Sequence, residues 1–160
     1  NATALVFAGL FFDGREAEQW LGKGMSLIEQ QVSEQILPDG GHFELSPMYH
    51  LIVLEDLLDA VNVCRTFGVK VPELWQTKIR RMLVWSAVMR HPDGQIPFFN
   101  DAVFGVAPVP AEIDRYAQRL GIQTIPPEPA SLSHLEDSGY VRLAKGPFVV
   151  LADVAEVGAR

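Results

Sequence analysis

Apolar residues recur three or four positions apart through most of the chain, a pattern that predicts a series of α-helices. The predicted helices span residues 2–12, 16–37, 46–67, 72–91 and 111–120. The first has almost no polar face, which predicts a buried helix. The second contains Gly22 and Gly24, which weaken the prediction because a glycine in a helix interior costs ~1 kcal/mol relative to alanine.

The third predicted helix has clear boundary residues. Ser46 provides a hydroxyl suited to the N-cap position, and Pro47 follows at the first helical position. Gly68 is the expected C-terminal stop. These residues define where the helix begins and ends.

The tripeptide Pro-Asp-Gly occurs at residues 38–40 and again at 92–94, so that the two aspartates lie 54 positions apart. Each copy follows a long amphipathic helix and precedes an irregular, partly apolar stretch. A period of about 50 residues is typical of stacked helical hairpins whose loops emerge on one face, where a binding cleft is usually built. Chance repetition of a common turn tripeptide is the alternative.

The pattern changes in the last quarter of the chain. Residues 122–136 carry three prolines and are typical of a linker, in which His134 is an unremarkable polar residue. Residues 139–143 and 148–153 are rich in β-branched and aromatic side chains and flank a predicted turn at 144–147, which predicts a β-hairpin. A lone two-stranded hairpin is marginal in water, so it is expected either to pack on the helices or to begin a larger β domain.

Composition narrows the class of protein. With 48% hydrophobic and 21% charged residues, the chain is too apolar for intrinsic disorder, yet no apolar run approaches the ~20 residues of a membrane span. The net charge of −7 argues against a nucleic-acid partner, although a short basic cleft for a polyanionic sugar can exist on an acidic protein. The single cysteine, Cys64, excludes an internal disulfide and leaves the cellular compartment open.

The most informative segment is residues 39–50, DGGHFELSPMYH, which places two histidines, two acids and a tyrosine around a helix N-terminus. If Ser46 is the N-cap, Tyr49 occupies the third helical position. There the free backbone N–H groups and the helix dipole favour negative charge by ~0.3–1 kcal/mol, which suits a tyrosinate or an anionic substrate. His50 points about 100° away from Tyr49 around the helix, so the two side chains need not face the same atom.

This segment, PDGGHFELSPMYH, and the apolar acidic helix LIVLEDLLDAVNV that follows it resemble the heparinase II/III-like family of polysaccharide lyases. The opening NATALVFAGLFFDGREAEQWL resembles the helices that lead to the motif, and the closing DSGYVRLAKGPFVVLADVAEVG resembles the start of the family's β-sandwich. The resemblance implies a mainly α-helical fold of hairpins from an incomplete (α/α) toroid, followed by a short β segment. Residues 1–121 would then belong to the toroid, 122–136 to a linker and 137–160 to the sandwich.

The same resemblance implies cleavage of uronic-acid-containing polysaccharides by β-elimination, with Tyr49 in the position of the family's catalytic tyrosine. Its implied role is to relay protons, as the base at C5 of the uronate, as the acid to the leaving glycosidic oxygen, or as both. Because a C5–H beside a carboxylate is a very poor acid, that carboxylate must be neutralised first. The family's neutralising Asn or His lies upstream of these residues and a second catalytic His lies further along the sandwich. The chain is therefore expected to be a fragment that is inactive by itself, and its exposed apolar surfaces are expected to favour self-association.

The other candidate substrate contacts are polar residues of the two loops and the helix start: His42, Glu44, His50, Asn100 and Asp101. His42 and Glu44 alternate in an extended loop and could share one side of it, or they could only satisfy backbone groups. His50 has packing or hydrogen bonding as its simpler role. Asn100 and Asp101 would lie near the cleft if the repeat is structural, with helix or turn capping as the alternative.

Three functions follow from these patterns. The first is a polysaccharide lyase acting on an acidic polysaccharide or oligosaccharide, without a cofactor. The alternative is a non-catalytic carbohydrate-binding or scaffold protein that retains the helical toroid. The third is an unrelated helical enzyme with a metal at residues such as His42, Glu44, His50 and His91, which lack a compact ligand pattern such as HExxH.

Overall fold

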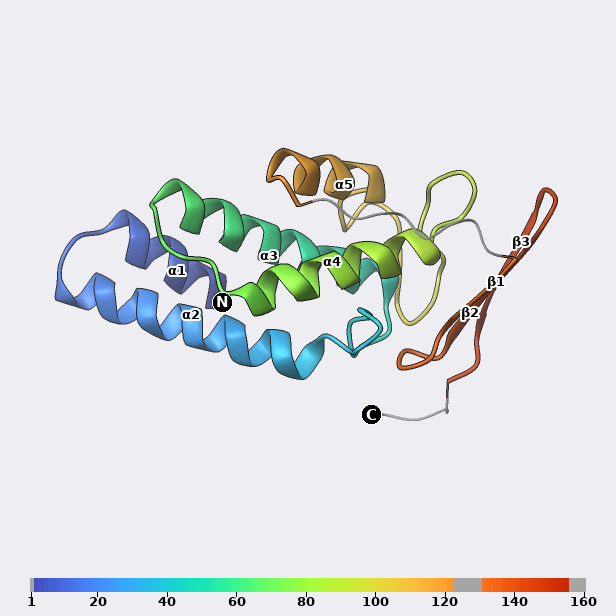
Figure 1. Ribbon diagram of the computed structural model, residues 1–160, viewed down its shortest axis with the longest axis horizontal. Helices are drawn as coiled ribbons and strands as arrows, with labels where there is room; N and C mark the ends of the chain where they lie inside the picture. The colour runs from blue at the N-terminus through green and yellow to red at the C-terminus, as the bar shows by residue number, and fades with distance from the viewer. Residues whose placement is uncertain (1, 123–130, 156–160) are drawn as a thin grey trace.

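The computed structural model describes residues 2–122 and 131–155. The helices and strands within these ranges are α1 (Ala2–Phe11), α2 (Arg15–Gln35), α3 (Pro47–Thr66), α4 (Glu73–Val88), α5 (Pro110–Arg119), β1 (Leu132–Leu135), β2 (Tyr140–Lys145) and β3 (Phe148–Asp153) (Figure 1). The predicted mainly helical fold with a short C-terminal β segment is confirmed. The predicted helix boundaries hold to within three residues.

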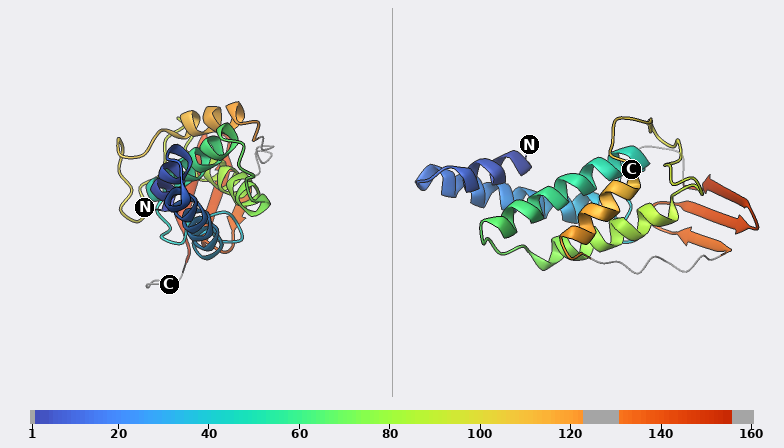
Figure 2. Two further views of the ribbon diagram at one scale, coloured as in Figure 1. Left: turned by 90° about the vertical axis from the view of Figure 1, so that its left-hand side faces the viewer. Right: turned by 90° about the horizontal axis from the view of Figure 1, so that it is seen from above.

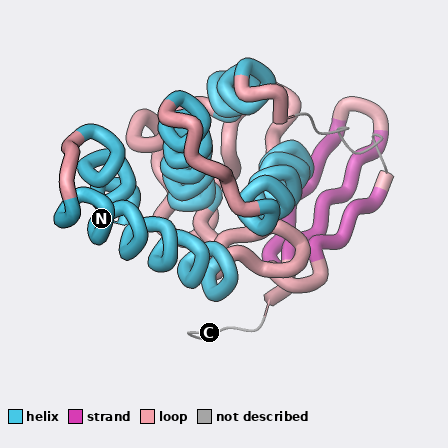
Figure 3. The backbone as a smooth tube through the Cα atoms, turned by 60° about the vertical axis from the view of Figure 1, so that its left-hand side comes forward, coloured by secondary structure: helices cyan, strands magenta, loops and turns pink. Residues whose placement is uncertain are grey.

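The helices form an elongated body with the strands at one end. Figure 1 shows α2 and α4 ending beside the sheet, while α3 begins there. The right-hand view in Figure 2 shows the sheet at one end of the body and α1 towards the other. Figure 3 shows the three strands as one layer beside the helices. The two loops that follow α2 and α4 therefore lie at the same end of the body, as the repeat predicts.

The long second helix continues through its glycines because one of them is needed for packing. A Cβ atom on Gly24 would lie 2.9 Å from the backbone nitrogen of Val6 on α1, and one on Gly9 would lie 2.5 Å from the backbone nitrogen of Leu21 on α2. The absence of side chains at both positions lets the backbones of α1 and α2 approach closely. This contact compensates for the low helix propensity of Gly24.

The prediction that the first helix is buried is wrong for the described part of the chain. Val6 is fully buried, but Phe7, Phe11 and Phe12 are 43%, 76% and 57% exposed. The physical reason is that α1 packs on α2 and α3 along one side only. Its other side therefore presents an apolar surface to solvent.

The core lies where α3 crosses α4, with contributions from α2 and α5. Its fully buried members include Leu54, Leu58, Val61, Trp75, Ile79 and Met82. A second, smaller cluster joins the end of α4 to the strands through Trp85, Met89, Leu135 and Tyr140. The sheet is therefore packed on the helical body and contributes to the same folded unit.

The strands form an antiparallel sheet in the order β1-β2-β3. The predicted hairpin is β2–β3, but residues 132–135, assigned to a linker from their sequence, form the edge strand β1, with His134 opposite Val141. Four residues carry too short a pattern to predict a strand, and pairing with β2 supplies the hydrogen bonds that stabilise it. The proline-rich residues 123–130 lie outside the described residues.

One face of this sheet is apolar and open to solvent. Leu132, Leu143 and Val150 are neighbours across the three strands and are 57%, 46% and 53% exposed. The opposite face carries Leu135 and Tyr140, which pack on the helices. The expected exposed apolar surface is thus present on the sheet as well as on α1, while self-association remains a prediction.

Candidate active site around Tyr49

The two Pro-Asp-Gly turns have the same local structure. Matching backbone hydrogen bonds close both: Leu37 N to Gly41 O and Gly40 N to Leu37 O in the first turn, His91 N to Gln95 O and Gly94 N to His91 O in the second. In each turn the aspartate Oδ1 also accepts from the backbone N–H two residues further on, at 2.9 Å for Asp39 and 3.0 Å for Asp93. The repeat at a spacing of 54 residues is therefore structural.

The first turn, unlike the second, is clamped against α4. A Cβ on Gly40 would lie 2.4 Å from the carbonyl oxygen of Arg81, whereas one on Gly94 would meet nothing within 4 Å. The Arg81 guanidinium donates to the carbonyl of Pro38 at 3.2 Å, and the Lys78 ammonium donates to that of Ile36. These cations cover the carbonyls that follow the C-terminus of α2, where positive charge is favourable.

Tyr49 lies in the first turn of α3 and is 39% exposed. Ser46 is the N-cap, as predicted: its hydroxyl accepts from the Tyr49 backbone N–H at 3.5 Å, and its carbonyl accepts from the N–H of His50 at 2.9 Å. Pro47 occupies the first helical position. Among the described residues, the Tyr49 hydroxyl has no hydrogen-bond partner, so the phenol is available to a ligand.

His50, the next residue, is directed into the core and is only 1% exposed. Its Nε2 lies 3.0 Å from the carbonyl oxygen of Met82, and its ring stacks on Trp85 with 4.3 Å between centroids. A carbonyl only accepts, so Nε2 carries the proton. Burial lowers the pKa of His50 to about 3, an effect that the bond to Met82 reduces and the nearby His42 increases. This position supports a packing role.

The histidine and the glutamate of the loop lie in different environments. His42 is 3% exposed, with Nε2 3.4 Å from Gln35 Oε1 and its ring edge against Phe43. Burial lowers its pKa to about 4. Glu44 is exposed to solvent. Of these two, only Glu44 presents its side chain to a ligand in solution.

Asn100 lies next to the first loop, as expected if the repeat is structural, and Asp101 follows it in sequence. Both have a positive φ, 46° and 64°, which is uncommon outside glycine. The Asn100 amide donates to the carbonyl of Leu45 and to the hydroxyl oxygen of Tyr140, both at 3.1 Å. Asp101 is exposed. Asn100 therefore links the two loops through contacts within the protein.

The sequence patterns did not indicate the residues that join these loops to the sheet. Asp39 Oδ2 accepts from the backbone N–H and the hydroxyl of Ser138 at 2.7 and 2.8 Å, and the Trp85 indole donates to the same hydroxyl at 2.9 Å. Tyr140, fully buried, donates to Leu45 O at 2.6 Å. These partners are 53 to 99 positions apart, so no local pattern signals them.

Comparison with known proteins now decides the family. A family model described as "Heparinase II/III N-terminus" matches residues 1–119, which include both turns and Tyr49. The chain belongs to the heparinase II/III family. This confirms the resemblance found in the sequence motif.

Individual proteins are also similar to this chain, one in sequence and two in fold. A heparin-sulfate lyase of Bacteroides stercoris is 33% identical over 105 residues, which cover 64% of this chain and 16% of that protein. A crystal structure of heparinase III superposes with a TM-score of 0.78 at 19% identity, covering 95% of this chain and 28% of that one. A heparan sulfate lyase from Pedobacter heparinus gives a TM-score of 0.72 at 19% identity, covering 94% and 26%. The chain spans about a sixth of the length of the curated relatives it matches.

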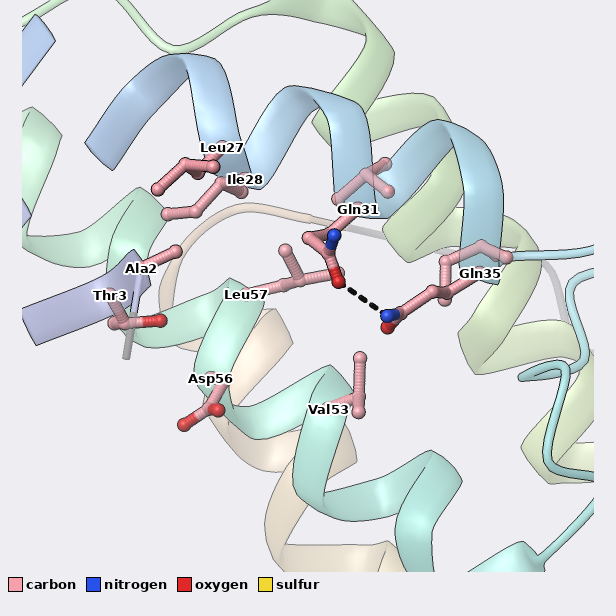
Figure 4. A pocket seen from close by; sticks show the side chains of 11 residues that line it. Ala2, Thr3, Leu27, Ile28, Gln31, Gln35, Val53, Asp56 and Leu57 are labelled. Atoms are coloured by element: carbon pink, nitrogen blue, oxygen red, sulfur yellow. Dashed lines mark hydrogen bonds between the residues drawn. The ribbon is translucent and has the colours of Figure 1, made fainter. Parts of the chain in front are cut away.

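This family member also has a pocket that Tyr49 does not line. It encloses about 410 Å³ between α2, α3 and the start of α1 (Figure 4). Its walls are apolar, but the amides of Gln31 and Gln35, hydrogen-bonded to each other, and the carboxylate of Asp56 also line it. Gln35 lies within reach of His42, so the pocket adjoins the base of the first loop.

Two further observations concern the described ranges 2–122 and 131–155. They contain no group of three or more His, Cys, Asp or Glu residues placed to hold a metal ion, so the metal alternative has no site there. Within them, none of the helices combines the length and the apolar character needed to cross a membrane.

Proposed function

We propose that the protein containing this chain is a lyase that cleaves uronic-acid-containing polysaccharide by β-elimination, with Tyr49 as its proton-transfer residue. The observation that carries the proposal is the exposed phenol of Tyr49, without a protein partner among the described residues, in a segment that matches the heparinase II/III family. The first turn of α3 presents the positive end of the helix dipole towards this region, which favours an anionic sugar. The named relatives are heparin-sulfate lyases, which supports an acidic polysaccharide as the substrate class.

In such a reaction the base removes the proton from C5, the C4–O bond to the leaving sugar breaks, and a C4–C5 double bond forms. The leaving oxygen takes up a proton. A tyrosine hydroxyl beside both atoms can transfer these protons. Neutralising the uronate carboxylate requires residues beyond those placed here, so the site is completed in the whole protein.

The remaining site residues divide by whether their side chains bond to protein partners in the described part of the chain. Glu44 and Asp101 are exposed at the loop end of the body and are proposed to contact substrate. Three of these site residues have side chains that hydrogen-bond to protein groups: His42, His50 and Asn100. We propose that these three residues shape the site around Tyr49. We further propose that residues 1–121 belong to the family's helical toroid and residues 132–160, which include edge strand β1, to its β-sandwich.

The test is the Tyr49→Phe variant of the whole protein, incubated with heparan sulfate and other uronate polymers. Unsaturated uronate ends absorb ultraviolet light, so product formation is followed directly. Loss of a proton-transfer group is expected to lower kcat by about 10²–10⁴-fold. Tyr116→Phe, at a tyrosine between α3 and α5, is the matched control and should retain activity. Unchanged activity in Tyr49→Phe would overturn the role of Tyr49.

The alternative is a non-catalytic carbohydrate-binding protein that retains the helical fold. It predicts binding of uronate oligomers by the whole protein without any rise in ultraviolet absorbance. Binding without turnover in the wild type would replace the lyase proposal by this one.

A further inference from the structure

Three segments far apart in sequence meet at one backbone carbonyl, that of Leu45. The Tyr140 hydroxyl, from β2, donates to this oxygen at 2.6 Å. The Asn100 amide, from the second loop, donates to the same oxygen at 3.1 Å and to the Tyr140 hydroxyl at 3.1 Å. The three groups form a closed triangle of hydrogen bonds, here called the Leu45 clamp.

The carbonyl belongs to a residue in an unfavourable conformation. Leu45 has a φ of 57°, and a non-glycine residue in this region costs about 1–3 kcal/mol, which the surroundings must offset. Asn100, which donates to the Leu45 carbonyl, also has a positive φ, of 46°. Two such residues bonded to each other show that this geometry is imposed by tertiary contacts.

The clamp is rigid on the side of the sheet. Tyr140 is fully buried, with its ring 5.8 Å from Trp85 and 5.1 Å from Phe99 between centroids. Burial, together with the charge of Asp153, raises the pKa of Tyr140, so its hydroxyl keeps the proton that it donates. The Tyr140 hydroxyl is therefore harder to deprotonate than that of an ordinary tyrosine, which preserves it as a donor.

Leu45 immediately precedes the N-cap of α3. Its peptide connects to Ser46, whose hydroxyl and carbonyl accept from the N–H groups of Tyr49 and His50. The orientation of the Leu45 carbonyl thus sets the direction in which the chain enters the helix. Tyr49, four residues after Leu45, takes its position from this entry.

We propose that Tyr140 and Asn100 are positioning residues for Tyr49, acting through the Leu45 clamp. This inference rests on the proposed function, in which Tyr49 transfers protons. A displacement of about 1 Å of a reacting group can cost on the order of 10²-fold in rate, so a loose helix start lowers turnover without removing any group that touches substrate. In this way the sheet contributes to the site without contacting substrate, because Tyr140 on β2 holds the loop that leads to Tyr49.

The test compares Tyr140→Phe with Tyr116→Phe in the whole protein. Tyr116 is a matched control because its hydroxyl also donates one hydrogen bond, to Asp59 at 2.6 Å, and accepts one from Asn62 at 3.0 Å. Amide hydrogen exchange at Tyr49 and His50 is expected to speed up by at least about 10-fold in Tyr140→Phe and to stay unchanged in Tyr116→Phe. The kcat for uronate polysaccharide should fall by about 10-fold or more in Tyr140→Phe alone, with KM within about 2-fold.

Two further variants distinguish positioning of Tyr49 from a general loss of stability. Asn100→Asp keeps a residue type that tolerates positive φ but removes the amide donor, so it should reproduce both changes. In the Tyr49→Phe background, Tyr140→Phe should lower kcat by less than about 2-fold, because the residue that it positions is gone.

The outcomes separate the inference from the proposed function. Unchanged exchange at Tyr49 and His50 in both Tyr140→Phe and Asn100→Asp would overturn the clamp, whatever the activity. Faster exchange with unchanged kcat would overturn its role in catalysis. A wild-type protein that binds substrate without turnover would overturn the proposed function, and the exchange rates would then decide on the clamp by themselves.

Discussion

The carboxylate of Asp39 accepts hydrogen bonds from both the backbone N–H and the hydroxyl of Ser138, at 2.7 and 2.8 Å, across 99 positions of sequence. Asp39 belongs to the first Pro-Asp-Gly turn, and Ser138 lies just before β2. This pair therefore ties the loop that leads to Tyr49 to the sheet. It complements the Leu45 clamp on the same loop.

Replacing Asp39 by Asn should destabilise the protein. The Asn side chain keeps one acceptor for Gly41 but offers an amide where Ser138 needs an acceptor. Loss of hydrogen bonds to a charged group costs about 1.5–3 kcal/mol in the free energy of unfolding, measured by urea denaturation. Asp93→Asn is the matched control, because Asp93 is exposed and its Asn replacement still accepts from Gln95. Equal losses in the two variants would contradict the role given to Ser138.

The two turn glycines should differ in their tolerance of alanine. Gly40 and Gly94 both have a positive φ, 97° and 86°. Gly94→Ala should cost only the conformational penalty of about 1 kcal/mol, since nothing lies within 4 Å of the added methyl. Gly40→Ala should cost several-fold more or prevent folding, because its methyl would meet the backbone of Arg81. Thermal unfolding of the pair measures the difference, and similar melting temperatures would refute it.

Replacing the two glycines of α2 by alanine should change the free energy of unfolding in opposite directions. Gly22 is exposed with nothing within 4 Å, so Gly22→Ala should stabilise the protein by about 0.5–1 kcal/mol through helix propensity. Gly24 lies against Val6, so Gly24→Ala should destabilise it by pushing α1 away. Urea denaturation of both variants is the measurement. Stabilisation by both would show that the close contact of α1 with α2 does not hold in solution.

Acid should destabilise the protein through its two buried histidines. The pKa is lowered to about 3 for His50 and about 4 for His42, below the ordinary value of 6.5. Between the lowered pKa of each histidine and its ordinary value of 6.5, the unfolded chain binds more protons than the folded one. The contribution of the neutral histidines to the free energy of unfolding is therefore fully present above pH 6.5. It is lost as the pH falls towards 4 for His42 and towards 3 for His50. Each histidine contributes a slope of up to about 1.4 kcal/mol per pH unit.

The His50→Gln variant tests this directly, because Gln can still donate to Met82 but does not titrate. The free energy of unfolding, measured from pH 7 to pH 4, should depend less steeply on pH in His50→Gln than in the wild type. A slope unaffected by His50→Gln would mean that His50 is protonated in the folded protein.

Much of the helical body was predictable because the signals are local. The spacing of apolar residues located all five helices, and Ser46 with Pro47 located the start of α3, since capping depends on neighbours within one turn. The repeated turns were visible for the same reason. Edge strand β1 was not predictable, because its hydrogen bonds come from β2 and its own four residues carry almost no pattern.

The site shows the same division. The motif of residues 39–50 indicates the family and points to Tyr49 as its candidate catalytic residue, and the structure shows that Tyr49 is partly exposed. The roles of the neighbouring polar residues depend on tertiary packing. The ring of His50 lies against Trp85, 35 positions away in sequence. The Asn100 amide donates to Leu45 and Tyr140. A polar residue in a motif can serve a ligand or the protein, and only its partners decide which.

Local sequence patterns were enough to predict the helices, the N-cap of α3, both Pro-Asp-Gly turns and the family, because each depends on residues close together in the chain. Tertiary structure alone decided which histidines are buried, which face of α1 is open, and how the sheet holds the loop before Tyr49. Those outcomes depend on hydrogen bonds and contacts between segments up to 99 positions apart. Their energies arise only when the chain has folded, so no local pattern can carry them.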